Sequence, residues 1–239
     1  MAVARLITFL VNGYSLADSL NNISVKAEQE ELDASVLANS YRSYETGFKT
    51  GEIDASGFFD CDTTNADEIH DVFASIYNSG ATNNITYSTT TPAVNGVAIM
   101  MNGCELKYNI GVPVGGLISV VSNFKATNGV GFGRWLMYAQ LNAGTTTGTA
   151  VDNAAATTGG GLFQVHLQNV DASDVDVKLQ HSTDNSTWGD VSGGAVNNLS
   201  ALFTSGSVAV SGTINRYTRA VAVVTGGNTT LVGAAFARR

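Results

Sequence analysis

The sequence predicts a mainly β protein with a single α-helix. The 239 residues include 26 Gly but only 2 Pro, and only 13% are charged. Thr, Ser, Asn, Gly and Val dominate, a balance that favours strands and turns over helices. Several stretches alternate apolar and polar residues with a period of two, whereas one stretch alone has the helical period. The length is ample for one large β domain or two smaller ones.

The first predicted strands carry charge on one face. Residues 5–11 form a short apolar run that ends at the turn signal Asn12-Gly13. Residues 23–30 and 51–57 then alternate, so that every second side chain of each predicted strand faces water. The charged positions of these two strands are Lys26, Glu28, Glu30, Glu52 and Asp54.

A long arm, residues 40–52, leads into the second of these strands. Long loops in compact domains are usually functional or disordered. This one is rich in aromatic and charged side chains, a composition that suits contact with another protein. The side chains in question are Tyr41, Arg42, Tyr44, Phe48 and Lys49.

One helix is predicted after the arm. Asn65 is placed to cap it, and Glu68, three residues on, completes a pattern like a capping box. Apolar residues then recur at i, i+3, i+4 and i+7, which predicts one buried stripe. The stripe consists of Ile69, Val72, Phe73 and Ile76. Gly80 supplies a left-handed stop.

Strands resume at residues 84–90, 96–101, 104–110, 117–126 and 135–141. Alternation places Glu105 and Lys107 on the polar face of one strand and Lys125 on the polar face of another. The glycines at 129, 131 and 133 look superficially like a phosphate-binding loop. However, the GK[ST] signature is absent, so we predict a turn there.

The second half of the chain predicts a β-sandwich. Residues 143–161 are Gly, Thr and Ala with little bulk, which indicates a linker. Candidate strands follow at residues 162–168, 175–181, 206–210, 216–224 and 229–237, and Asp184 marks a hairpin before Trp188. We therefore expect a first domain at residues 1–142, a linker at 143–161 and a second domain at 162–239.

No residue pattern predicts catalysis or metal binding. His70 is expected as a solvated helix residue, and alternation puts His166 and His181 on opposite faces of a strand pair. Cys61 and Cys104 fit no metal-ligand spacing and are expected as small buried residues. The aspartates at 171, 174 and 176 lack the calcium-loop spacing. We expect no enzymatic activity, cofactor or metal.

The charge and hydropathy of the sequence indicate which classes of binding partner are not expected. The net charge is −8, so free nucleic acid is not expected as a high-affinity partner. No apolar run approaches the ~20 residues that cross a bilayer. The apolar stretch Leu6–Val11 is interrupted by Thr8 and is shorter than the ~7–15 residues of a signal-peptide core. We expect a product made in the cytoplasm, with no membrane partner.

Three blocks of sequence resemble one known family. They are Asn12-Gly-Tyr-Ser-Leu16, the segment YRSYETGFKTGEIDASGFFD at 41–60 together with the helix after it, and the closing stretch from Arg216. The chain is similar to the major tail tube proteins of long-tailed, siphovirus-like bacteriophages. The closing stretch resembles the outer domain appended to many of them.

The resemblance implies a fold, an assembly and a location. The fold would be a tail-tube β-sandwich or barrel with one α-helix, followed by a C-terminal β-sandwich. Subunits would form hexameric rings that stack into a tube in the virion tail, after synthesis in the host cytoplasm. The partners would be copies of the chain and other phage tail proteins, with genomic DNA passing through the lumen during ejection.

The resemblance also gives residues their roles. The arm would contact the next ring through Tyr41, Arg42, Tyr44, Phe48 and Lys49. The charged strand faces would line the lumen, through Lys26, Glu28, Glu30, Glu52, Asp54, Glu105, Lys107 and Lys125. Two other classes remain open: a carbohydrate-binding β-sandwich protein, suggested by Trp188, and a phage head decoration or tail terminator protein.

Overall fold

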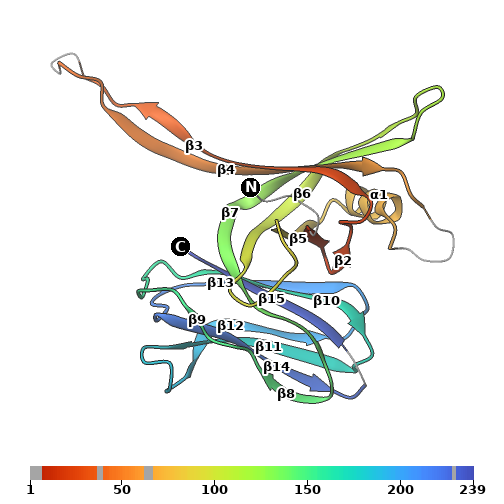
Figure 1. Cartoon of the computed structure of the whole chain (residues 1–239). Coiled ribbons are helices and arrows are strands. Elements are labelled where there is room, and N and C mark those ends of the chain that lie inside the picture. The colour runs from red at the N-terminus through yellow and green to blue at the C-terminus, as the bar shows by residue number, and fades with distance from the viewer. Residues whose placement is uncertain (1–6, 37–39, 62–66, 228–229) are drawn as a thin grey trace. The chain divides into compact units, whose positions relative to one another are not determined.

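The computed structural model describes residues 7–36, 40–61, 67–227 and 230–239. Across these residues the protein is mainly β with one α-helix, which confirms the predicted fold class (Figure 1). The chain forms two compact units. We call Ser19–Thr82 with Met101–Val130 the arm unit, and Met1–Asp18, Asn83–Met100 and Gly131–Arg239 the sandwich unit. Strands β6 (Val97–Gly111) and β7 (Ser119–Leu141) contribute residues to both.

The arm unit is built on a sheet in the order β3-β4-β7-β6. Two of its strands, β3 (Leu20–Asp33) and β4 (Tyr44–Phe58), pair antiparallel over almost their whole length. The other edge of β4 pairs with β7, from Glu52 opposite Lys125 to Phe58 opposite Ser119. In Figure 1, β3 and β4 project as a ribbon from one end of this unit, and the β6–β7 hairpin projects from the other end.

Helix α1 (Ile69–Ser79) belongs to the arm unit, and its predicted apolar stripe is confirmed. Ile69, Val72, Phe73 and Ile76 are all buried, and the Phe73 ring meets the edge of Phe124 on β7 with 5.7 Å between centroids. The helix ends as predicted, because Gly80 has φ +60° and its N–H donates to the Ile76 carbonyl. The helix starts later than predicted, because it begins after Glu68. The predicted cap, Asn65, lies outside the described residues.

The sandwich unit contains two sheets. One runs β13-β10-β15-β7-β6-β5-β1-β2, and the other runs β12-β11-β14-β8 with β9 also on β14. Their strands not yet given are β1 (Thr8–Val11), β2 (Tyr14–Ser15), β5 (Thr82–Ser88), β8 (Gly144–Thr147), β9 (Val151–Asp152), β10 (Gly161–Val170), β11 (Asp174–Ser182), β12 (Gly189–Leu199), β13 (Thr204–Val210), β14 (Tyr217–Thr225) and β15 (Thr230–Arg238). Apolar residues of β10 and β15, such as Phe163 and Phe236, form one core cluster with Val177 of β11 and Ala222 of β14.

Three details of the sandwich unit differ from expectation. Part of the stretch 143–161 is sheet, since β8 and β9 both pair with β14. Strand β12 was not predicted. The glycine run at 129–133 lies inside β7 and is not a turn. A Cβ at Gly133 would lie 2.3 Å from the Phe236 carbonyl oxygen, so glycine permits the close approach of β15. The division into a tube domain and an outer domain at residue 142 stays a prediction.

Candidate assembly surfaces

The predicted arm is a two-stranded ribbon rather than a loop. Gln29 pairs with Lys49, Glu31 with Thr46 and Asp33 with Tyr44, with a bulge between the first two pairs. Beyond the strands, the Ala34 N–H donates to the Ser43 carbonyl at 2.8 Å. We call residues 29–36 and 40–49 the ribbon. Backbone hydrogen bonds hold its two strands together, and it projects from the rest of the arm unit (Figure 1).

The ribbon exposes aromatic and aliphatic side chains. Tyr41 is 87% exposed and Phe48 is 83% exposed, and Tyr44, Leu32 and Val36 are exposed as well. The five side chains predicted for contact all lie on the ribbon and are exposed: Tyr41, Arg42, Tyr44, Phe48 and Lys49. Arg42 reaches Asp33 at 3.9 Å across the ribbon. Exposed apolar groups at this density are typical of an interaction surface.

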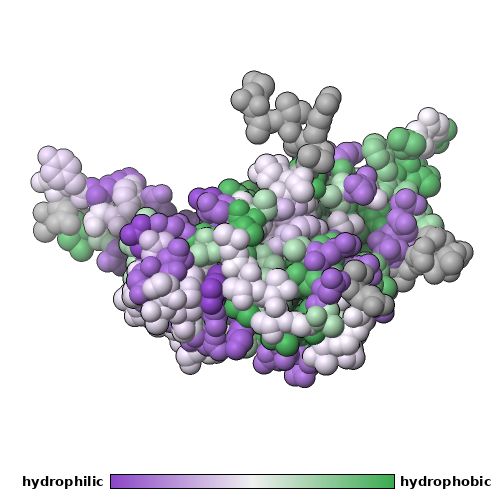
Figure 2. Space-filling model, turned by 60° about the horizontal axis from the view of Figure 1, so that its bottom comes forward, coloured by the Kyte–Doolittle hydropathy of each residue, from purple (hydrophilic) through white to green (hydrophobic). Residues whose placement is uncertain are grey.

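A second exposed apolar region was missed by the sequence reasoning. We call residues 106–118 the tip hairpin; they comprise the end of β6 and the turn that leads into β7. Val112 is 72% exposed, and most of the other large apolar side chains here are exposed too: Leu106, Ile110, Val114, Leu117 and Ile118. Figure 2 shows green, hydrophobic surface over this projecting hairpin, whereas the ribbon is mixed in character. The run of apolar residues beside Pro113 and two glycines was the available signal.

The polar face of the arm-unit sheet brings together most of the residues predicted for the lumen. The register places Lys26, Glu52 and Lys125 side by side on three strands. In the next row Asp54 lies opposite Asn123, whose amide donates to Asp54 at 2.7 Å and also to Glu52. This face therefore carries charges of both signs, and its side chains hydrogen-bond to one another within the sheet. We call it the mixed-charge lattice.

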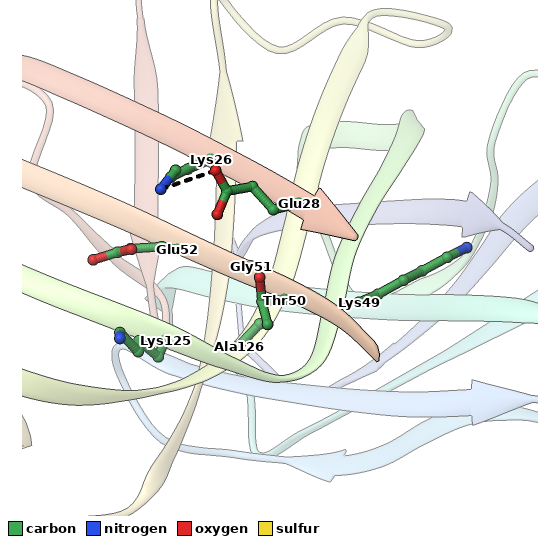
Figure 3. Close-up of a pocket in the computed structure, with 8 residues that line it drawn as sticks. All are labelled: Lys26, Glu28, Lys49, Thr50, Gly51, Glu52, Lys125 and Ala126. Atoms are coloured by element: carbon green, nitrogen blue, oxygen red, sulfur yellow. Dashed lines mark ion pairs between the residues drawn. The ribbon is translucent and has the colours of Figure 1, made fainter. Parts of the chain in front are cut away.

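A pocket of about 310 Å³ opens beside these strands (Figure 3). Lys26 and Glu28 come from β3, Lys49 and Glu52 from β4, and Lys125 from β7. Lys26 and Glu28 form an ion pair at 3.0 Å, and hydrogen bonding to Glu28 raises the pKa of Lys26. Three ammonium groups and two carboxylates line the pocket, so charges of both signs face it.

Three members of the predicted lumen set lie apart from this lattice. Glu105 is only 6% exposed, and its carboxylate accepts a 2.5 Å hydrogen bond from Ser122. Ser122 and Asn123 are neighbours on β7, so their side chains point to opposite faces of the sheet. Glu105 therefore lies on the buried face, and we correct its predicted position. Glu30 belongs to the ribbon, where its carboxylate accepts from the Phe48 N–H at 3.4 Å, and Lys107 is exposed on the tip hairpin.

Burial shifts the ionisation of Glu105. Desolvation raises the pKa of its carboxyl group to about 7, although the hydrogen bond from Ser122 opposes this shift. Its second oxygen, Oε2, has no hydrogen-bond partner. Tyr108, also in the arm unit, has its pKa raised to about 12, by desolvation first and by Glu105 second.

The histidines and cysteines differ from their expected settings. His70 hydrogen-bonds Tyr108 through Nδ1 at 2.6 Å and packs on Phe59, so it is more than a solvated helix residue. His166 is fully buried and bonded to Thr86 at 2.8 Å; burial lowers its pKa to about 3. His166 and His181 lie in different sheets, not on a paired strand. Cys61 is exposed rather than buried.

Trp188 lies in a network of the second sheet that is satisfied internally. The Arg219 guanidinium covers one face of the indole at 4.0 Å and also donates to Gln180 at 2.9 Å. Gln180 in turn donates to Asp190 at 2.6 Å, and Lys178 binds the same carboxylate at 2.9 Å. These side chains use their hydrogen-bonding groups on one another.

Within the described residues, no group of three His, Cys, Asp or Glu side chains is arranged to hold a metal ion. No helix among those residues is long and apolar enough to cross a membrane.

Comparison with known proteins gives structural likenesses only. No protein-family model and no curated protein matches the chain. A chain of the virion of a native gene transfer agent particle is 14% identical with a TM-score of 0.44, over 55% of this chain and 98% of that one. The Dit protein of phage SPP1, a protein of a hub adsorption apparatus, is 12% identical with a TM-score of 0.37, over 98% of this chain and 100% of that one. A chain of the phage p2 baseplate is 7% identical with a TM-score of 0.36, over 96% and 98%.

Proposed function

We propose that this protein is a structural subunit of a phage tail, and more specifically of the tail tube. In this role it forms six-membered rings that stack into a tube and conduct DNA during ejection. The observation that carries the proposal is the arm-unit sheet. One of its faces is buried with α1, the opposite face is polar, and β3 is paired along one side only, with β4, among the described strands.

An unpaired strand edge favours ring formation. The edge of β3 offers a row of backbone N–H and C=O groups that can pair with another chain, and closing a ring satisfies such edges. If neighbouring copies pair at this edge, their sheets join into a barrel with the helices outside. The polar faces then line the interior.

The chemistry of the polar face suits a conduit for DNA. Its side chains alternate in sign, from Lys26 to Glu52 to Lys125 across three strands. A continuous basic surface would hold phosphates through many ion contacts. A surface on which each ammonium group has a carboxylate neighbour offers no such row, so the polymer can slide past.

The carbohydrate-binding alternative is less well supported. Sugar recognition by an indole uses a ring face, and Arg219 already covers one of the two faces of Trp188, while Gln180 is bonded to Arg219 and Asp190. We therefore place the function in assembly rather than in binding at the second sheet.

Negative-stain microscopy of the purified full chain tests the proposal. We expect rings or tubes with a central channel, with more tubes at higher protein concentration. A protein that stays monomeric at every concentration, or that forms only aggregates without a channel, contradicts the proposal. Single rings that never stack would favour the tail terminator alternative.

A further inference from the structure

Two exposed apolar projections lie at opposite ends of the arm unit. The ribbon stands at one end and the tip hairpin at the other (Figure 1). Each carries several large apolar side chains in water, among them Tyr41 and Phe48 on the ribbon and Val112 and Leu117 on the hairpin. Because they belong to the same unit and point away from one another, one copy cannot bring them together.

The two projections are complementary in charge. The tip hairpin has a single charged residue, Lys107, and it is exposed. The ribbon is net acidic, because four carboxylates outnumber Arg42 and Lys49. These carboxylates belong to Glu30, Glu31, Asp33 and Glu45. Every copy thus has an apolar, acidic surface at one end of the arm unit and an apolar, basic surface at the other.

We propose that the ribbon of one copy docks onto the tip hairpin of a second copy. This inference rests on the proposed function and names the partner of the ribbon within the assembly. The contact is heterologous: different surfaces of identical chains meet, so each docked pair leaves one free ribbon and one free hairpin. It would bury apolar side chains from both partners and set Lys107 against carboxylates.

A contact of like with like is less favourable. Two ribbons facing one another would oppose acidic side chains, and like charges across an interface reduce affinity. Two hairpins facing one another would oppose Lys107 with Lys107 and leave the ribbons exposed to water. Only the ribbon-to-hairpin arrangement covers both apolar surfaces and pairs opposite charges.

Two variants, each blocked at one end, test the docking mode. The ribbon variant carries Tyr41→Ser, Tyr44→Ser and Phe48→Ser, and the hairpin variant carries Val112→Ser, Val114→Ser and Leu117→Ser. All six side chains are exposed, so both variants should fold. The matched control carries Tyr77→Ser, Phe132→Ser and Leu202→Ser, which are exposed apolar residues outside both projections.

The readout is particle mass, measured by light scattering or native mass spectrometry. We expect the wild type and the control to polymerise, and each blocked variant alone to stop at one small species. Mixing the two variants in equal amounts should double that mass and go no further, since only blocked ends then face outward.

Polymers formed by either variant alone, or a mixture that yields no new species, would overturn this docking mode. A wild type that stays monomeric would overturn the proposed function and the docking mode with it. The two failures are therefore distinguishable.

Discussion

At the scale of single residues, Glu105 shows what alternation cannot reveal. The alternating pattern of β6 predicted a water-facing carboxylate beside Lys107, but Glu105 is buried and bonded to Ser122. Alternation separates two faces of a strand but does not say which face another element covers. His166 is a second example. Gln164 and His166 lie on the polar face of β10, yet this face is buried, and both side chains bond with Thr86.

Replacing Glu105 should change how stability depends on pH. Its pKa is raised from 4.5 to about 7 by burial, so the folded state favours the protonated form. The stability it contributes is full below pH ~4.5 and is lost as the pH rises through 7. The Glu105→Gln variant keeps a neutral group of similar shape. It should match the wild type near pH 4.5 and exceed its free energy of unfolding by up to about 3 kcal/mol at pH 8.

Urea unfolding of both proteins at pH 5 and pH 8 measures this difference. Glu45→Gln, on the exposed ribbon, controls for the loss of one acidic side chain elsewhere in the arm unit. An equal stability difference between Glu105→Gln and wild type at the two pH values would show that Glu105 is not a titrating buried group.

At the scale of elements, strong hydrophobic periodicity predicted helices and strands correctly, whereas glycines led to wrong predictions of loops and turns. The stripe of α1 and most strands of the sandwich unit followed from spacing, because burial repeats with the geometry of the element. The ribbon was predicted as a loop because Gly47 and Gly51 weaken the strand signal and a bulge interrupts the pairing near Gln29. The glycines of β7 were predicted as a turn, but Gly133 serves close strand packing.

Gly133→Ala should destabilise the protein. The added methyl group would lie 2.3 Å from the Phe236 carbonyl oxygen, so β7 and β15 must move apart. Overpacking of this kind costs about 1–3 kcal/mol. The matched control is Gly189→Ala, whose methyl group would meet nothing closer than His181 at 4.0 Å. Thermal unfolding should show a lower Tm for Gly133→Ala alone, and equal Tm values would contradict the close approach.

At the scale of the whole molecule, the sequence predicted the fold class but not the compact units. The linker was inferred from small residues, yet β8 and β9 add to β14. β6 and β7 each serve both units, and no local composition marks the change from one to the other. The tip hairpin was missed because its apolar residues fit strand ends equally well, and only the structure shows that no described part of the chain covers them.

In the proposed tube, reversing charge on the polar face should impede DNA passage. Changing Glu28 and Asp54 together to Lys removes two carboxylates from the neighbourhood of Lys26 and leaves ammonium groups that bind phosphate. Such contacts add along a strand and weaken with salt. Particles with this variant should eject DNA more slowly than wild type, with the largest difference at low salt. Normal ejection kinetics from well-formed tails would show that this face does not line the channel.

In the proposed tail, the placement of the ribbon and tip hairpin has a consequence for how assembly begins and ends. A stack joined by unlike surfaces has direction: one terminus presents only ribbons, and the other presents only tip hairpins. The proteins that start and stop such a polymer must then have different shapes and opposite charge preferences, an acidic groove receiving one end and a basic groove the other. Orientation of the tail relative to the capsid would thus already be encoded in each subunit before any tail is assembled.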